Sequence, residues 1–232
     1  MSERITNLQN WMNTRGPVIP VDGEWGPVTR SALIEVFRNK NATAVTPEDI
    51  RQLALDLGCT ERQIKAVAQV ESAGGGWDDA GLLKCLWERH YLWRRVKVAV
   101  PFLSDPSAGG YTTDADRDGI NDSWEKLADA TGRFGFNVAA ECASFGKFQI
   151  MGAHWKALGY PSVAQFIWRL SRSEAEHYKA FGKFIEVNGL RGALWQVSGR
   201  AGDCTAIARG YNGKGQRGYD ERIAAAYRGM TG

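Results

Sequence analysis

Residues 60–76 read TERQIKAVAQVESAGGG and combine a helix start, an apolar helix face and a run of glycines. Thr60 and Gln63 form a capping box, in which each side chain satisfies a backbone N–H at the helix start. Apolar residues then recur at helical spacing, at Ile64, Val67 and Ala68. Glu71 continues the same spacing, and glycine favours a helix end. The segment therefore predicts a helix that carries Glu71 at its C-terminus, on the apolar face and beside a flexible loop.

Two features of this position favour a protonated Glu71. Burial penalises the charged carboxylate and raises its pKa, and the negative end of a helix adds to the effect. A carboxyl group with a raised pKa is the kind of acid that protonates a glycosidic oxygen. The local pattern alone leaves a structural role open, in which Glu71 forms a buried ion pair with a basic residue.

Further helix signals predict a mainly α-helical fold. Helices are expected over residues 46–57, 60–71, 171–188 and 219–228. Thr46 is expected to cap the first of these, and Ser171 with Glu174 to form the capping box of the third. We expect few strands.

The chain is expected to hold two domains. Residues 1–42 read as a small helical unit, 43–48 as a polar linker and 49–232 as the larger domain. A unit of about forty residues is marginal for independent folding. We therefore expect it to pack on its neighbour or to use every apolar residue it has.

Composition excludes several classes of protein. The 232 residues carry a formal net charge of +3, which is too weak to indicate nucleic acid as a partner but is compatible with an anionic polymer. No apolar run approaches the length of a transmembrane helix, and the polar N-terminus does not resemble a signal peptide. The four cysteines lack CxxC spacing and the three histidines lack HExxH spacing, which argues against a zinc site or a zinc peptidase.

Two later segments carry uncharged hydrogen-bonding side chains suited to sugars. Residues 143–152 place Ser144 and Gln149 among small and apolar residues, and residues 208–213 contain Tyr211 and Asn212. Each segment alone is more often structural.

Taken together, these segments resemble the N-acetylmuramidase family of modular phage endolysins, within the lysozyme-like superfamily. The resemblance spans roughly residues 48–230. It rests on residues 66–76, Leu86-Trp87-Glu88-Arg89-His90, Gly109-Gly110-Tyr111, residues 144–152 and Tyr211-Asn212-Gly213. It implies a lysozyme-like α-helical domain that hydrolyses the bond between N-acetylmuramic acid and N-acetylglucosamine.

The resemblance also assigns roles to single residues. Glu71 matches the catalytic acid of the family, and Glu88 matches its second carboxylate, in the Glu-Arg-His motif. Glu88 could instead pair with a neighbouring arginine. The remaining substrate-binding candidates are Ser72, Ser144, Gln149, Tyr211 and Asn212.

Residues 1–42 resemble the small three-helix peptidoglycan-binding module of wall hydrolases. The match rests on Leu8-Gln9, on Asp22-Gly23-Glu24-Trp25-Gly26, and on Thr29 with Ala32-Leu33. It implies that Asp22 and Trp25 take part in wall binding. The alternative is that the glycine-rich segment is only a turn.

Residues 114–125, DADRDGINDSWE, fit the D-x-D-x-D-G-x5-E pattern of calcium-binding loops. The expected oxygen ligands are Asp114, Asp116, Asp118, the carbonyl of Ile120, Asp122 and Glu125. The segment before the loop is not helical, so a single loop is expected and not a paired EF-hand. Its calcium would be structural, and no cofactor is required for the chemistry. A solvated acidic loop is the alternative.

The leading hypothesis is thus a monomeric endolysin that hydrolyses peptidoglycan for host-cell lysis. It would be made in the host cytoplasm and reach the wall through a separate hole-forming protein, with no membrane insertion and no nucleic-acid partner. One alternative is a lytic transglycosylase, in which the 6-hydroxyl of the sugar attacks and 1,6-anhydro ends form. The other is a non-catalytic wall-binding protein.

Overall fold

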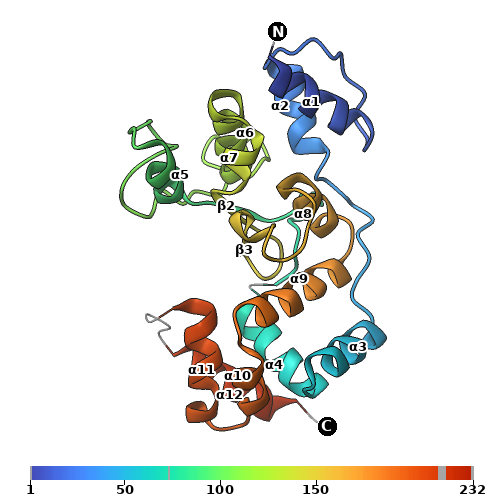
Figure 1. The fold of residues 1–232 in the computed structure, drawn as a ribbon, viewed down its shortest axis with the longest axis vertical. Coiled ribbons are helices and arrows are strands. Elements are labelled where there is room, and N and C mark those ends of the chain that lie inside the picture. The colour runs from blue at the N-terminus through green and yellow to red at the C-terminus, as the bar shows by residue number, and fades with distance from the viewer. Residues whose placement is uncertain (1, 73, 214–217, 231–232) are drawn as a thin grey trace. The chain divides into compact units, whose positions relative to one another are not determined.

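The computed structural model describes residues 2–72, 74–213 and 218–230, and these are mainly α-helical, as predicted. The chain divides into two compact units (Figure 1). The first unit comprises residues 1–42 and 77–172, and the second comprises residues 43–76 and 173–232. Among the described helices, none is both long and apolar enough to cross a membrane.

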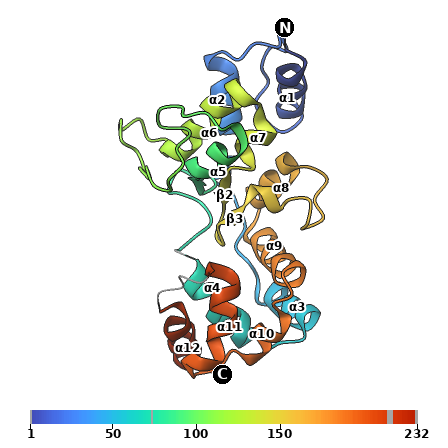
Figure 2. The ribbon, with the colours of Figure 1, turned by 60° about the vertical axis from the view of Figure 1, so that its left-hand side comes forward.

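The second unit is entirely helical in its described part. Its helices are α3 (Pro47–Leu57), α4 (Glu61–Glu71), α9 (Glu174–Val187), α10 (Arg191–Gln196), α11 (Ala201–Asn212) and α12 (Tyr219–Gly229). Helix α12 packs against both α4 and α11 (Figure 2). The side chains of Ile64, Val67 and Ala68 are buried on α4, which confirms the predicted apolar face.

The helix starts of this unit follow the predicted capping in two of three cases. Thr46 caps α3 and Thr60 caps α4, each through a capping box. The prediction for α9 was wrong by two residues, because Ser173 caps it by accepting a hydrogen bond from the backbone N–H of Glu176. Ser171 instead donates its hydroxyl to the carbonyl of Trp168, at the end of the preceding helix.

The first unit combines helices with a small sheet. Its elements are α1 (Glu3–Asn13), α2 (Pro27–Glu35), β1 (Cys85–Trp87), α5 (Arg89–Val96), α6 (Asp122–Phe134), α7 (Phe136–Ala140), β2 (Ala143–Phe145), β3 (Ile150–Met151), the 3-10 turn η1 (Gly152–His154) and α8 (Val163–Leu170). The strands pair antiparallel in the order β1-β2-β3. Leu86 lies opposite Ser144, which in turn lies opposite Met151.

Residues 2–42 contain two described α-helices, one fewer than in the predicted three-helix module. This segment packs onto α6 and α7. The fully buried ring of Phe37 stacks on Trp124 at a centroid distance of 5.2 Å and on Phe136 at 6.1 Å. Arg30 also pairs with Glu125 at 2.8 Å. Two short helices bury little apolar surface of their own, so this segment shares its core with residues 77–172. The predicted division into domains 1–42 and 49–232 with a linker at 43–48 stays a prediction. The two compact units of the structure have different boundaries.

Candidate functional site

Glu71 is the last residue of α4, as the glycine run predicted. The side chain of Glu71 is half-buried. The next residue, Ser72, donates its backbone N–H to the carbonyl of Ala68. Ser72 leaves the helical conformation with φ −101° and ψ 112°. The chain therefore turns away at Glu71 and leaves this carboxylate at the edge of the helix bundle.

The glycine segment after Glu71 includes one position that excludes any side chain. A Cβ atom on Gly76 would lie 2.0 Å from Cε1 of His177, a residue of α9 that is buried to 1% exposure. Such a distance is far inside van der Waals contact. The close approach of the His177 ring thus requires glycine here and ties the loop to α9.

Tyr211 is the predicted sugar-binding residue that the structure brings to Glu71. It lies near the end of α11, and its ring packs on Phe184 at 5.1 Å and on Phe181 at 6.1 Å. Burial, and secondly the charge of Glu71, raise the pKa of Tyr211 well above its ordinary value. A carboxylate and a phenol therefore lie together in the second unit. The side chain of Asn212 lies outside the described residues.

Glu88 directly follows β1 in the first unit. Its backbone N–H donates to the carbonyl of Cys142 at 3.0 Å, which continues the pairing of β1 with the chain before β2. The side chain is 16% exposed, and its Oε2 accepts a hydrogen bond of 2.8 Å from the hydroxyl of Tyr111. Nδ1 of His90 lies 3.2 Å from the same oxygen. Glu88 could be predicted from the sequence, but a role for Tyr111 could not, because only the folded loop shows that contact.

Ser144 and Gln149 form a hydrogen-bonded pair in the β2–β3 hairpin. The hydroxyl of Ser144 donates to Oε1 of Gln149 at 2.9 Å, and Nε2 of Gln149 donates to the carbonyl of Gly146 at 2.8 Å. Gln149 has a φ of +47°, which is unusual for a residue with a side chain. The exposed Gln149 is therefore oriented by its own turn, which is a property expected of a binding residue.

The acidic loop places its carboxylates in two overlapping groups, each with oxygens within 4.8 Å of one another. One group is Asp114, Asp116 and Asp122, and the other is Asp116, Asp118 and Glu125. Oδ1 of Asp114 is buried and accepts no hydrogen bond among the described residues. The residues before the loop are not helical and α6 follows it, as predicted.

The predicted wall-binding residues both make contacts inside the first unit. Asp22 accepts a hydrogen bond of 2.7 Å from the buried Gln9, whose amide also donates to Thr29. This bond, followed by one from the backbone of Glu24, lowers the pKa of Asp22. Trp25 lies against α6, where a Cβ atom on Gly132 would meet its ring at 2.3 Å. These contacts give both residues a structural role.

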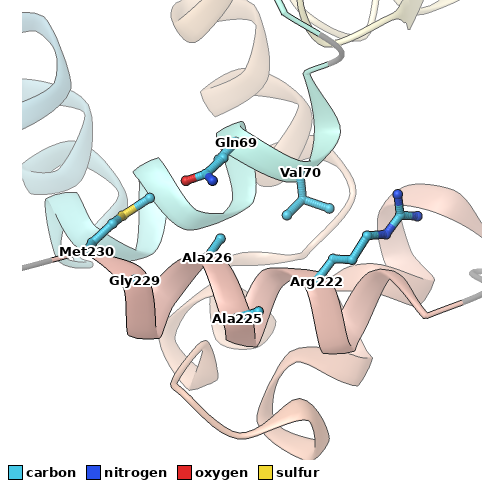
Figure 3. A pocket seen from close by; sticks show the side chains of 7 residues that line it. All are labelled: Gln69, Val70, Arg222, Ala225, Ala226, Gly229 and Met230. Atoms are coloured by element: carbon cyan, nitrogen blue, oxygen red, sulfur yellow. The ribbon is translucent and has the colours of Figure 1, made fainter.

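A groove of about 510 Å³ runs between α4 and α12 (Figure 3). It is lined by Gln69, Val70, Arg222, Ala225, Ala226, Gly229 and Met230. No carboxylate is among the described residues that line it, so the groove does not include the candidate acid Glu71.

Residues 60–231 match the family model described as N-acetylmuramidase. The chain belongs to the N-acetylmuramidase family. It is also similar to a solved endolysin of the Burkholderia phage AP3, at 28% identity and a TM-score of 0.70. That match covers 98% of this chain and 94% of the phage protein. A comparison with curated proteins finds no match.

This N-acetylmuramidase is therefore a glycoside hydrolase that acts on peptidoglycan, and its helical fold agrees with the lysozyme-like fold that the sequence predicted. The matched residues include Glu71 and Tyr211 of the second unit. They also include Glu88, Ser144 and Gln149 of the first unit.

Proposed function

We propose that the chain hydrolyses the β-1,4 bond between N-acetylmuramic acid and N-acetylglucosamine, with Glu71 as the general acid. The supporting observation is the position of Glu71. It ends α4, is half-buried, and its charge contributes to the raised pKa of Tyr211, which is also half-buried. A half-buried position at a helix C-terminus favours the protonated acid that the leaving oxygen needs.

The second carboxylate in this proposal is Glu88. Glycosidases commonly pair an acid with a carboxylate that activates water or stabilises the positively charged sugar of the transition state. Glu88 is 16% exposed and is held by Tyr111, so its orientation is defined before substrate binds. Ser72, Ser144, Gln149, Tyr211 and Asn212 are proposed to bind the glycan through its hydroxyl and acetamido groups.

We also propose that the protein works as an endolysin. The phage AP3 relative carries that name and matches almost the whole of this chain. In this proposal a monomer is made in the host cytoplasm and reaches the wall through a separate hole-forming protein. Residues 1–42 would add affinity for the wall. The hydrogen bond between Gln9 and Asp22 would hold the loop that contains Asp22 against α1.

The residues of the acidic loop fit a structural calcium ion. Asp114 offers a buried oxygen that accepts no hydrogen bond from the described part of the chain. The neighbouring carboxylates supply the hard oxygen ligands that calcium prefers. Asp114, Asp116, Asp118, Asp122, Glu125 and the carbonyl of Ile120 would hold it. Glu125 also pairs with Arg30, so the ion would stabilise the loop against the first helices of the chain. The chemistry of bond cleavage does not need it.

Digestion of purified cell walls tests the role of Glu71. Glu71→Gln keeps the shape of the side chain but removes the acid, so turbidity should stay constant while wall binding and the circular dichroism spectrum stay normal. A matched control is Glu3→Gln, an exposed position on α1, which should digest walls like the wild type. Digestion by Glu71→Gln at the wild-type rate would remove Glu71 from the mechanism.

A further inference from the structure

The side chain of Tyr111 makes a hydrogen bond to the proposed second carboxylate. Its hydroxyl donates to Oε2 of Glu88 at 2.8 Å, across 23 residues of sequence. The Tyr111 side chain is otherwise 50% exposed. Holding an exposed tyrosine in one conformation costs side-chain entropy, so this arrangement is favoured by a loop that holds the ring in place.

The loop around Tyr111 is held from two sides. Arg89, the residue after Glu88, donates to the carbonyls of Ser107 at 3.0 Å and Ala108 at 3.2 Å. Lys126 of α6 donates to the carbonyl of Gly110 at 2.9 Å and to the hydroxyl of Thr112 at 3.0 Å. The residues on either side of Tyr111 are thus both fixed by charged donors.

Gly110 allows this approach because it carries no side chain. Its φ is +72°, and a Cβ atom there would lie 3.2 Å from a guanidinium nitrogen of Arg89. The middle residue of the Glu-Arg-His motif therefore anchors the loop, while the other two face each other. Glu88 and Tyr111 meet because Arg89 brings the loop back to the end of β1.

Both partners of Glu88 lie at the same oxygen. The hydroxyl of Tyr111 donates to Oε2, and Nδ1 of His90 lies 3.2 Å from it. Oε1 accepts no hydrogen bond from the described residues. The carboxylate is therefore held by one oxygen and presents the other.

We propose that Tyr111 is a positioning residue that holds Glu88 through Oε2, so that Oε1 faces the water or the sugar. This inference rests on the proposed role of Glu88. Burial, followed by the hydrogen bond to Glu88, raises the pKa of Tyr111, so the phenol keeps its proton and remains a donor at neutral pH. Among the described residues, Arg89 and the imidazole of His90 also lie near this pair.

Steady-state digestion of soluble peptidoglycan fragments by Tyr111→Phe tests the proposal. The variant keeps the ring and loses only the hydroxyl. We expect kcat to fall by about ten- to a hundredfold, the range for a hydrogen bond to a charged group, with KM within about twofold. The melting temperature should stay within about 2 °C of the wild type.

Tyr91→Phe is the matched control. Tyr91 lies on α5, its ring packs on His90 at 4.7 Å, and its hydroxyl makes no hydrogen bond with the described residues. It should digest like the wild type. If Glu88→Gln loses activity while Tyr111→Phe keeps the wild-type kcat, the positioning role of Tyr111 is wrong and the role of Glu88 stands. If Glu88→Gln keeps wild-type activity, the proposed role of Glu88 fails, and with it the inference about Tyr111.

Discussion

The carboxylate of Glu71 and the phenol of Tyr211 are electrostatically coupled within the second unit, where the charge of Glu71 adds to burial in raising the pKa of Tyr211. The two residues come from α4 and α11, about 140 positions apart in the sequence. Their coupling brings the candidate acid to one of the polar side chains predicted to bind glycan.

The raised pKa of Tyr211 predicts how stability changes at alkaline pH. Above about pH 10 the unfolded chain releases phenolic protons that the folded chain keeps, so stability falls as pH rises. Tyr178, whose pKa is raised to about 12, contributes in the same direction. Tyr211→Phe should therefore lose less stability than the wild type between pH 8 and pH 10.5, as measured by urea midpoints. Equal losses in both proteins would contradict the raised pKa of Tyr211.

The close packing of Gly76 against His177 predicts a local sensitivity. Gly76→Ala should destabilise the protein by about 1–3 kcal/mol, because the new Cβ overlaps the buried imidazole ring. Gly192→Ala is the control, since nothing lies within 4 Å of that position on α10 and a small gain in stability is expected. Chemical denaturation of both variants measures the contrast. Equal stability of the two would show that the loop relaxes freely.

The shared core of the first unit predicts that residues 1–42 contribute to the stability of the catalytic chain. Phe37→Ala should cost about 3–5 kcal/mol, because it opens a cavity against Trp124 and Phe136. Val18→Ala, at a position that is 86% exposed, should change stability by less than about 0.5 kcal/mol. An independent module would instead give Phe37→Ala a separate, early unfolding transition in calorimetry, with the main transition unchanged.

The acidic loop predicts stabilisation by calcium. At a hundred times its dissociation constant, an ion that binds only the folded chain adds about 2.7 kcal/mol, which raises the melting temperature by several degrees. Asp118→Asn should abolish the rise, while Asp79→Asn, at an exposed position outside the loop, should keep it. A wild-type melting temperature that is the same in millimolar calcium and in chelator would exclude the site.

Much of the helical architecture could be predicted because its signals are local. The capping boxes at Thr60 and Thr46 and the apolar spacing before Glu71 each lie within a few residues. The error at α9 was also local: two serines stand two residues apart, and only the tertiary context decides that Ser173 caps the helix while Ser171 bonds backward to Trp168.

The remaining site could not be predicted because it depends on contacts between distant segments. Sequence spacing does not show that Tyr111 reaches Glu88, or that Trp25 lies against Gly132. The same holds for the compact units, since the stacking of Phe37 on Trp124 joins the first helices to the middle of the chain. Family resemblance supplied the substrate, which local physical reasoning about Glu71 did not specify.

The most direct test of the account is mass spectrometry of peptidoglycan digested by the wild type and by Glu71→Gln. We predict fragments that end in reducing N-acetylmuramic acid from the wild type, and no fragments from Glu71→Gln despite normal folding. Fragments with 1,6-anhydro ends would show that the sugar's own hydroxyl attacks in place of water. Undiminished digestion by Glu71→Gln would contradict the central claim that Glu71 is the catalytic acid.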